Sequence, residues 1–122
     1  DPSNRLIYPD KITMSEFFPL PNELAKHNIF PGVSITTCAA SQMMMSLVKM
    51  EPNSEVKSHS HPHEQIGIVL KGRAVFKIGD EKKELAVGDF YRIPSNVLHQ
   101  VWSFEEGAEA LDIFSPIRED YL

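Results

Sequence analysis

From Val33 onward, the chain alternates between short stretches of β-forming residues and turn residues such as glycine, proline, asparagine and aspartate. Roughly nine strands separated by turns every 8–12 residues, with little helix, indicate an all-β domain built as a sandwich or a small barrel. The predicted strands cover residues 34–38, 43–50, 56–61, 65–71, 73–78, 82–87, 90–93, 97–104 and 108–114.

The first 32 residues differ from the rest because they contain five of the nine prolines. Proline fixes φ and removes a hydrogen-bond donor, so this segment is predicted to be an arm of short extended pieces. About one helical turn is expected in residues 22–27, after Pro21. The chain is long enough for one domain only, which we divide into an N-terminal arm, residues 1–32, and a barrel, residues 33–122.

Charge and composition argue against several classes of partner. The net charge of −5 disfavours nucleic acid, whose binders carry basic patches. No apolar run approaches the roughly 20 residues of a membrane helix, and the N-terminus lacks the features of a signal peptide. The single cysteine, Cys38, cannot form an internal disulfide. We therefore expect a cytoplasmic protein that binds neither nucleic acid nor membrane.

Three of the five histidines cluster in the segment His59-Ser-His-Pro-His63. On a strand, residues two apart lie on one face, about 6.6 Å apart along the chain. His59 and His61 can therefore direct their imidazoles at one metal ion, whose bonds to histidine nitrogens measure about 2.0–2.1 Å. The cluster predicts a metal site.

Further ligands are expected from Gln65 and from a distant histidine. Pro62 cannot donate a hydrogen bond in a strand, so a new strand is expected to start at Gln65, whose carbonyl oxygen can turn back to the ion. The fourth ligand must come from His99 or His27. A lone histidine among valines is normally a core residue, but beside the His59 cluster we favour His99 as a ligand.

The chain resembles the cupin superfamily in the first of two motifs, which has two histidines one residue apart, an acidic ligand and a later glycine. The residues at these positions are His59, His61, Gln65 and Gly72. Gln65 replaces the usual glutamate, and His63 and Glu64 are the alternatives for this ligand. His63 would share a face with His61 by simple alternation, but Pro62 makes that alternation unreliable.

The second cupin motif is a glycine, a proline, a second glycine, a histidine and an asparagine at fixed spacing. The residues at these positions are Gly88, Pro94, Asn96, His99 and Ser103. Asn96 replaces the second glycine and Ser103 replaces the asparagine, and neither change affects a predicted ligand. The resemblance implies a double-stranded β-helix, the jelly-roll barrel of cupins, with one divalent metal ion inside.

Three neutral imidazoles and a neutral amide leave a divalent site near +2, whereas a glutamate would reduce the charge to about +1. The more positive ion is a better Lewis acid and attracts anionic or hydroxyl-rich molecules. Proton transfer, ring opening or lyase chemistry is therefore favoured over dioxygen chemistry. The ligand set does not distinguish among zinc, nickel, manganese, iron and copper.

At the C-terminus, Asp112 and Phe114 share a face of the predicted strand 108–114, and Arg118 follows. An acidic side chain inside a small barrel requires a partner. Taken alone, the pattern favours a salt bridge between Asp112 and Arg118 that holds the C-terminal tail.

The segment His-Ser-His-Pro-His-Glu-Gln, followed later by Leu-Asp-Ile-Phe-Ser-Pro-Ile-Arg-Glu-Asp-Tyr-Leu, also resembles the pectin-degradation protein family of uronate-linearising cupins. The resemblance covers roughly residues 30–122. It implies a metal held by three histidines and a glutamine, and a catalytic site completed by Asp112, Phe114 and Arg118. Members open 4,5-unsaturated uronic acid monomers, released by pectin or alginate lyases, towards the linear keto sugar.

This resemblance implies a carboxylated or hydroxyl-rich small-molecule substrate. By hypothesis, Arg118 pairs with the substrate carboxylate, Asp112 moves a proton and Phe114 forms an apolar wall. The cupin pattern also occurs in polyketide cyclases and in proteins named only as cupin domains. A cyclase, another lyase or isomerase, and a non-catalytic small-molecule sensor or binding module therefore stay open as alternatives.

Both faces of the predicted strand 65–71 are apolar, with Ile66, Ile68 and Leu70 on one face and Gly67 and Val69 on the other. Both faces are therefore expected to be covered, either by a second sheet or by another subunit. Because the resembled family usually dimerises, we expect a homodimer. The run 43–45, three methionines, is interpreted as core packing.

Overall fold

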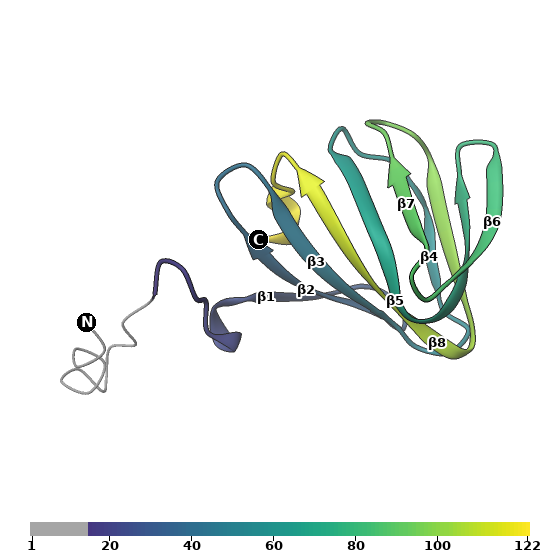
Figure 1. Ribbon diagram of the computed structural model, residues 1–122, viewed down its shortest axis with the longest axis horizontal. Coiled ribbons are helices and arrows are strands. Elements are labelled where there is room, and N and C mark those ends of the chain that lie inside the picture. The colour runs from purple at the N-terminus through teal and green to yellow at the C-terminus, as the bar shows by residue number, and fades with distance from the viewer. Residues whose placement is uncertain (1–14) are drawn as a thin grey trace.

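Two long strands, β5 (Glu64–Ile78) and β8 (His99–Ser115), run antiparallel through the centre of the fold (Figure 1). The computed structural model describes residues 15–122. Within them the predicted all-β barrel is confirmed. The other elements are η1 (Pro21–Glu23), β1 (Ala25–Phe30), β2 (Val33–Ala39), β3 (Met44–Met50), β4 (Glu55–His59), β6 (Glu81–Ala86), β7 (Phe90–Ile93) and η2 (Glu119–Tyr121).

The barrel has two halves that share β5 and β8. One half has the strand order β1-β2-β3-β8-β5-β7, and the other has the order β4-β8-β5-β6. Inward-facing apolar side chains from both halves form the core, among them Val33, Val69, Phe76, Ile93 and Val101. The site therefore forms from residues of both halves.

The passage from one half to the other depends on Gly72 in β5 and Gly107 in β8. Their φ angles are +66° and +71°, in the left-handed region that favours glycine. A Cβ on Gly72 would collide with the backbone oxygen of Gly107, and a Cβ on Gly107 would collide with the backbone oxygen of Met50. Glycine at both positions lets the two strands bend together without a steric clash.

These bends explain why two strand predictions were wrong. Residues 65–71 and 73–78 were predicted as two strands divided by Gly72, but both lie in the continuous β5. Likewise, residues 99–104 of the predicted strand 97–104 and all of the predicted strand 108–114 lie in the single β8, which begins at His99. A glycine with positive φ bends a paired strand and shifts its register without ending it. The predicted hairpin at Gly79 is confirmed by the pairing of β5 with β6.

Part of the predicted arm joins the barrel. Its first 14 residues lie outside the described part of the chain. The expected helical turn in residues 22–27 was only partly right, because the 3-10 helix η1 covers Pro21–Glu23 and the residues from Ala25 onward form β1, which pairs antiparallel with β2. The division into an arm of residues 1–32 and a barrel of residues 33–122 stays a prediction.

The prediction that methionines 43–45 pack in the core is wrong for two of the three. Met44 is buried, but Met45, its neighbour in β3, is exposed because alternate residues of a strand point to opposite faces. Met43, just before β3, is also exposed. Cys38 is half-buried. Among residues 15–122, neither helix is long enough to span a membrane.

Candidate metal centre

Three histidines from two strands and the loop after β4 meet inside the barrel. His59 ends β4 and pairs in register with His99 at the start of β8, and His61 lies two residues beyond His59. The rings of His59 and His99 are 4.2 Å apart, and those of His61 and His99 are 5.0 Å apart, measured between centroids. One ring nitrogen from each histidine lies within 4.8 Å of the others. This geometry fits one metal ion.

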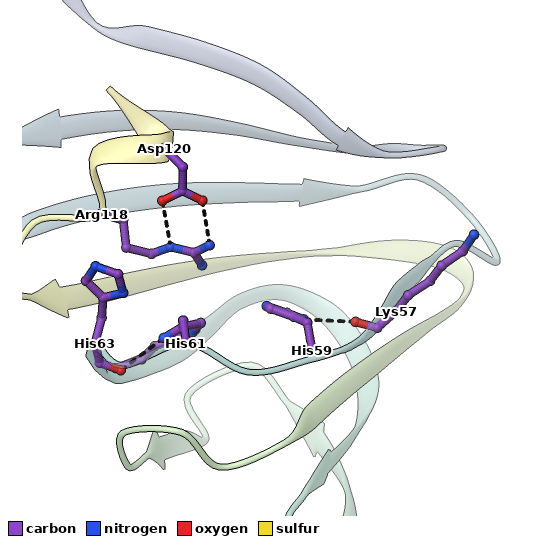
Figure 2. Close-up of polar contacts among 7 residues, drawn as sticks. Lys57, His59, His61, His63, Arg118 and Asp120 are labelled. Carbon is purple, nitrogen blue, oxygen red and sulfur yellow. Dashed lines mark hydrogen bonds and ion pairs between the residues drawn. The ribbon is translucent and has the colours of Figure 1, made fainter.

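Each of the three rings is oriented by a backbone carbonyl two residues away. The Nδ1 of His59 donates to the Lys57 oxygen at 2.8 Å, and the Nδ1 of His99 donates to the Val97 oxygen at 2.8 Å. His61 Nδ1 lies 3.0 Å from the oxygen of His63, and Figure 2 shows the contacts of His59 and His61. A proton held on Nδ1 leaves the Nε2 lone pair available to a metal.

Burial keeps two of these histidines neutral. Burial, together with the nearby charges of His59, His61 and Arg118, lowers the pKa of His99 to about 4, although the hydrogen bond to the Val97 oxygen opposes this change. The pKa of His61 is also lowered, first by burial and then by the charge of Arg118. A neutral imidazole is the form that binds metal, so both rings are ready for an ion at neutral pH.

Gln65 reaches this cluster from β5. Its Oε1 lies 3.0 Å from His61 Nε2, and its side chain also hydrogen-bonds Asp112. The amide nitrogen therefore faces Asp112 and the oxygen faces His61. With the His61 proton on Nδ1, two acceptors face each other, which is unfavourable unless a cation lies beside both. The donor set thus fits a metal bound by three imidazoles and one amide oxygen.

The alternative ligands lie elsewhere. His63 is half-buried and its side chain lies on the Arg118 side of the loop (Figure 2). Glu64 is exposed. His27 lies on β1, where its ring is 6.4 Å from that of Tyr121. Of the candidates weighed against Gln65 and His99, none belongs to the three-histidine cluster within the described residues.

Asp112 is buried and bound by Tyr91, which donates to Asp112 Oδ1 at 2.5 Å. The two side chains meet above Gly67, where a Cβ would collide with both. Burial raises the pKa of Asp112 to about 6, although the hydrogen bonds from Tyr91 and Gln65 and the charge of Arg118 oppose the rise. Asp112 therefore exchanges a proton readily near neutral pH.

Arg118 pairs with Asp120 rather than with Asp112. Its Nη2 and Nε lie 2.8 Å and 3.3 Å from the two Asp120 oxygens (Figure 2). Its guanidinium also stacks on Tyr121, 3.8 Å from the ring centroid. The expected salt bridge between Asp112 and Arg118 was thus wrong, because η2 brings a nearer carboxylate.

One cavity joins these groups. It has about 530 Å³ of free space, a volume that includes its opening to solvent. Six of the predicted site residues line it, and the seventh, His61, contacts Gln65 at its edge. The lining residues among the predictions are His59, Gln65, His99, Asp112, Phe114 and Arg118.

Sequence reasoning missed Tyr91 and Asp120. The alternation in residues 90–93 places Tyr91 on the inward face with Ile93, and this signal could have identified it as a partner for a buried acid. No pattern signalled Asp120, because its contact with Arg118 depends on the turn into η2.

The comparisons with known proteins agree with this geometry. Residues 46–114 match the family model described as cupin domain. The chain is 37% identical over 84 residues to the pectin degradation protein KdgF of Dickeya dadantii, a match that covers 68% of this chain and 76% of that protein.

Two solved structures are also similar. KdgF from Halomonas sp. superimposes with a TM-score of 0.75 and 28% identity, covering 84% of this chain and 96% of that one. An RmlC-like cupin from Shewanella frigidimarina superimposes with a TM-score of 0.78 and 26% identity, covering 88% of this chain and 97% of that one.

Proposed function

The chain belongs to the cupin domain family and, within it, to the pectin-degradation family of KdgF, and from this premise we propose that it is an enzyme that opens the ring of 4,5-unsaturated uronic acid monomers. The observation that carries the proposal is the cavity in which Asp112 and Arg118 lie beside the three-histidine cluster. The cavity therefore brings together a guanidinium that can bind a carboxylate, a carboxyl group that can carry a proton, and three histidines that can bind a metal ion.

The reaction defines what the residues must do. In a 4,5-unsaturated uronate, the carboxylate is next to the double bond and the ring oxygen. Ring opening is an isomerisation, in which the hydroxyl proton on C1 leaves, the bond between C1 and the ring oxygen breaks, and C4 gains a proton. The site must therefore bind a carboxylate, polarise an oxygen and move a proton.

The metal-binding residues in this proposal are His59, His61, His99 and Gln65. When bound, a divalent ion would supply Lewis-acid polarisation of the sugar oxygens. The backbone contacts at Nδ1 support this assignment, since they fix the ring orientations before an ion arrives. Zinc, nickel, manganese and iron all suit this set of nitrogen and oxygen ligands.

Arg118 is assigned to the substrate carboxylate. Asp120 accepts hydrogen bonds from Nε and Nη2, so this ion pair does not use Nη1. The guanidinium is thus held by one edge against Asp120 and by one face against Tyr121. A planar cation fixed in this way binds a carboxylate with little further loss of entropy.

Asp112 is assigned to proton transfer and Phe114 to the cavity wall. With a pKa of about 6, Asp112 is populated in both forms near that pH, so it can accept one proton and deliver another. Phe114 is buried, and its ring packs edge-on against His61 at 5.6 Å. An apolar wall beside the polar groups excludes water from the reacting ring.

A spectrophotometric assay tests the proposal. Metal-loaded protein is incubated with 4,5-unsaturated galacturonate, and the loss of ultraviolet absorbance from the conjugated double bond is followed. We expect decay faster than the spontaneous rate, lost in Arg118→Ala and retained in Arg73→Ala, a matched arginine outside the cavity. No acceleration by metal-loaded protein would contradict the proposal and favour a cyclase, another lyase or a binding module on the same site.

We further propose that the protein acts as a cytoplasmic homodimer. An outer apolar face crosses β3, β8, β5 and β7 on the side opposite the cavity, and Leu47 in β3 and Phe90 in β7 are 52% and 77% exposed. The face consists of Met45, Leu47, Ile66, Ile68, Phe90, Leu111 and Ile113. A contiguous apolar surface of this kind favours a self-complementary contact with a second copy.

A further inference from the structure

A row of inward-facing residues crosses the barrel through five neighbouring strands. In the strand register, Thr37 pairs with Ser46, Ser46 with Asp112, Asp112 with Gly67, and Gly67 with Tyr91. The row passes through β2, β3, β8, β5 and β7 in that order. It carries the proposed proton carrier, Asp112, in its middle.

All but one of the side chains in this row have a partner. Thr37 donates to the backbone oxygen of Tyr121 at 2.8 Å, Tyr91 donates to Asp112, and the glycine has no side chain. Ser46 is the exception. It is 0% exposed, and its Oγ has no hydrogen-bond partner in the part of the chain that the structure describes.

The neighbouring inward rows offer Ser46 nothing to bond. Along β3, its inward neighbours are Met44 and Val48, and across from these on β8 lie Phe114 and Ala110. A buried hydroxyl without a partner destabilises the fold, and an apolar residue would pack better at such a position. Ser46 is one of the residues that line the cavity.

We propose that Ser46 is a substrate-binding residue, whose Oγ forms a hydrogen bond with a hydroxyl of the sugar acid on the side of the cavity next to Asp112. The inference rests on the proposed function and adds a contact that selects polyhydroxylated acids. Arg118 holds the carboxylate, and Ser46 holds the ring at a second point. Two such points orient the ring towards Asp112, which a single ion pair cannot do.

Ser46→Ala and the matched control Ser34→Ala test the inference. Ser34 lies on β2, and its side chain is not part of the cavity. Steady-state kinetics with 4,5-unsaturated galacturonate and thermal denaturation are measured for both variants and the wild type. For Ser46→Ala we expect kcat/KM to fall by about tenfold, mainly through KM, as for the loss of one hydrogen bond. We expect its melting temperature without substrate to be unchanged or higher.

The melting temperature separates this role from a structural one. If Ser46 supports the fold through buried water, Ser46→Ala lowers the melting temperature and leaves KM unchanged, which would overturn the inference. Kinetics of Ser46→Ala equal to those of Ser34→Ala and the wild type would also overturn it while the proposed function stands. Absence of turnover by the metal-loaded wild type would overturn the proposed function and this inference together.

Discussion

At the scale of single residues, the candidate centre is organised by short local contacts. Each of the three histidines places Nδ1 against a carbonyl two residues away, so the Nε2 atoms are oriented by their own segments of chain. Gln65 differs, because its amide links the histidine cluster to Asp112. This double contact gives a physical reason for glutamine where other cupins have glutamate.

Gln65→Glu is therefore expected to keep the metal and lose turnover. A carboxylate can replace the amide oxygen beside His61, but it cannot donate to Asp112, and its negative charge would raise the pKa of Asp112 further. We expect metal content, measured by inductively coupled plasma mass spectrometry, to stay at the wild-type level. We expect kcat to fall by about 10²-fold or more, on the scale of a lost general acid–base contribution. Gln42→Glu, at an exposed position, is the control.

Asp112→Asn removes the proposed proton carrier while preserving its shape. Proton transfer by a positioned group contributes typically about 10²–10⁴-fold, so we expect turnover to fall by at least that lower factor, with metal still bound. The ultraviolet assay and metal analysis measure the two effects separately. Asp80→Asn, in an exposed turn, should behave as the wild type. Full turnover by Asp112→Asn would remove Asp112 from the mechanism.

At the scale of elements, β5 and β8 do most to position the site. Gln65 lies on β5 and His99, Asp112 and Phe114 lie on β8, so the antiparallel register of these two strands brings metal-binding and proton-carrying residues together. Asn96, in the turn before β8, helps to hold the loop that carries His61. The backbone N–H of Asn96, which has φ +64°, donates to the His61 oxygen at 2.8 Å. Asparagine tolerates this left-handed conformation, which explains its place at a motif glycine.

Ser103 is the other departure from the cupin motif, and it too has a structural role. Its hydroxyl donates to the Glu51 oxygen at 2.8 Å and accepts from the Ser54 backbone nitrogen at 2.9 Å. These contacts fasten β8 to the turn between β3 and β4. Serine therefore supplies hydrogen bonds at a position where the motif has asparagine.

Gly67→Ala tests the packing of β5 between its neighbours. The new Cβ would collide with Tyr91 and lie 2.5 Å from Asp112 Oδ1, so the Tyr91–Asp112 hydrogen bond would have to shift. Overpacking of this kind costs about 1–3 kcal/mol. We expect the free energy of unfolding, measured by urea denaturation, to fall by that amount. A variant as stable as the wild type would show that the space above Gly67 is larger than described.

At the scale of the whole molecule, the barrel separates two surfaces. The inward side holds the cavity, whereas the outer apolar face lies on the reverse of the same strands. Ser46 and Leu47 illustrate this separation, since they are adjacent in β3 but face the cavity and the exterior respectively. Assembly through the outer apolar face would therefore leave the cavity lining unchanged.

Leu47→Lys tests the role of the outer apolar face. A charge in the middle of a self-complementary apolar contact is desolvated and meets its own copy, so the dimer should dissociate. Size-exclusion chromatography with light scattering should give a dimer for the wild type and for Leu122→Lys, an exposed control, and a 13.8 kDa monomer for Leu47→Lys. A monomeric wild type would contradict the proposed assembly.

The sequence by itself determined the all-β class, the hairpin at Gly79 and the proximity of the candidate residues His59 and His61. The all-β class and the hairpin depend on the period of two along a strand and on the preferences of glycine and proline. His59 and His61 are close because only one residue separates them, although His61 lies beyond the end of β4. The sequence also indicated His99 and Gln65 through motif spacing. Such properties are local, and a pattern over a few residues contains them.

Only the tertiary structure decided how distant segments meet. The pairing of Asp112 with Tyr91 and the burial of Ser46 without a hydrogen-bond partner among the described residues depend on strand register and on the bends at the glycines of β5 and β8. The pairing of Arg118 with Asp120 depends on the turn into η2. A register shift of one residue would reverse every side chain between cavity and exterior. Since register follows from the packing of the whole barrel, no local pattern in the sequence specifies these contacts.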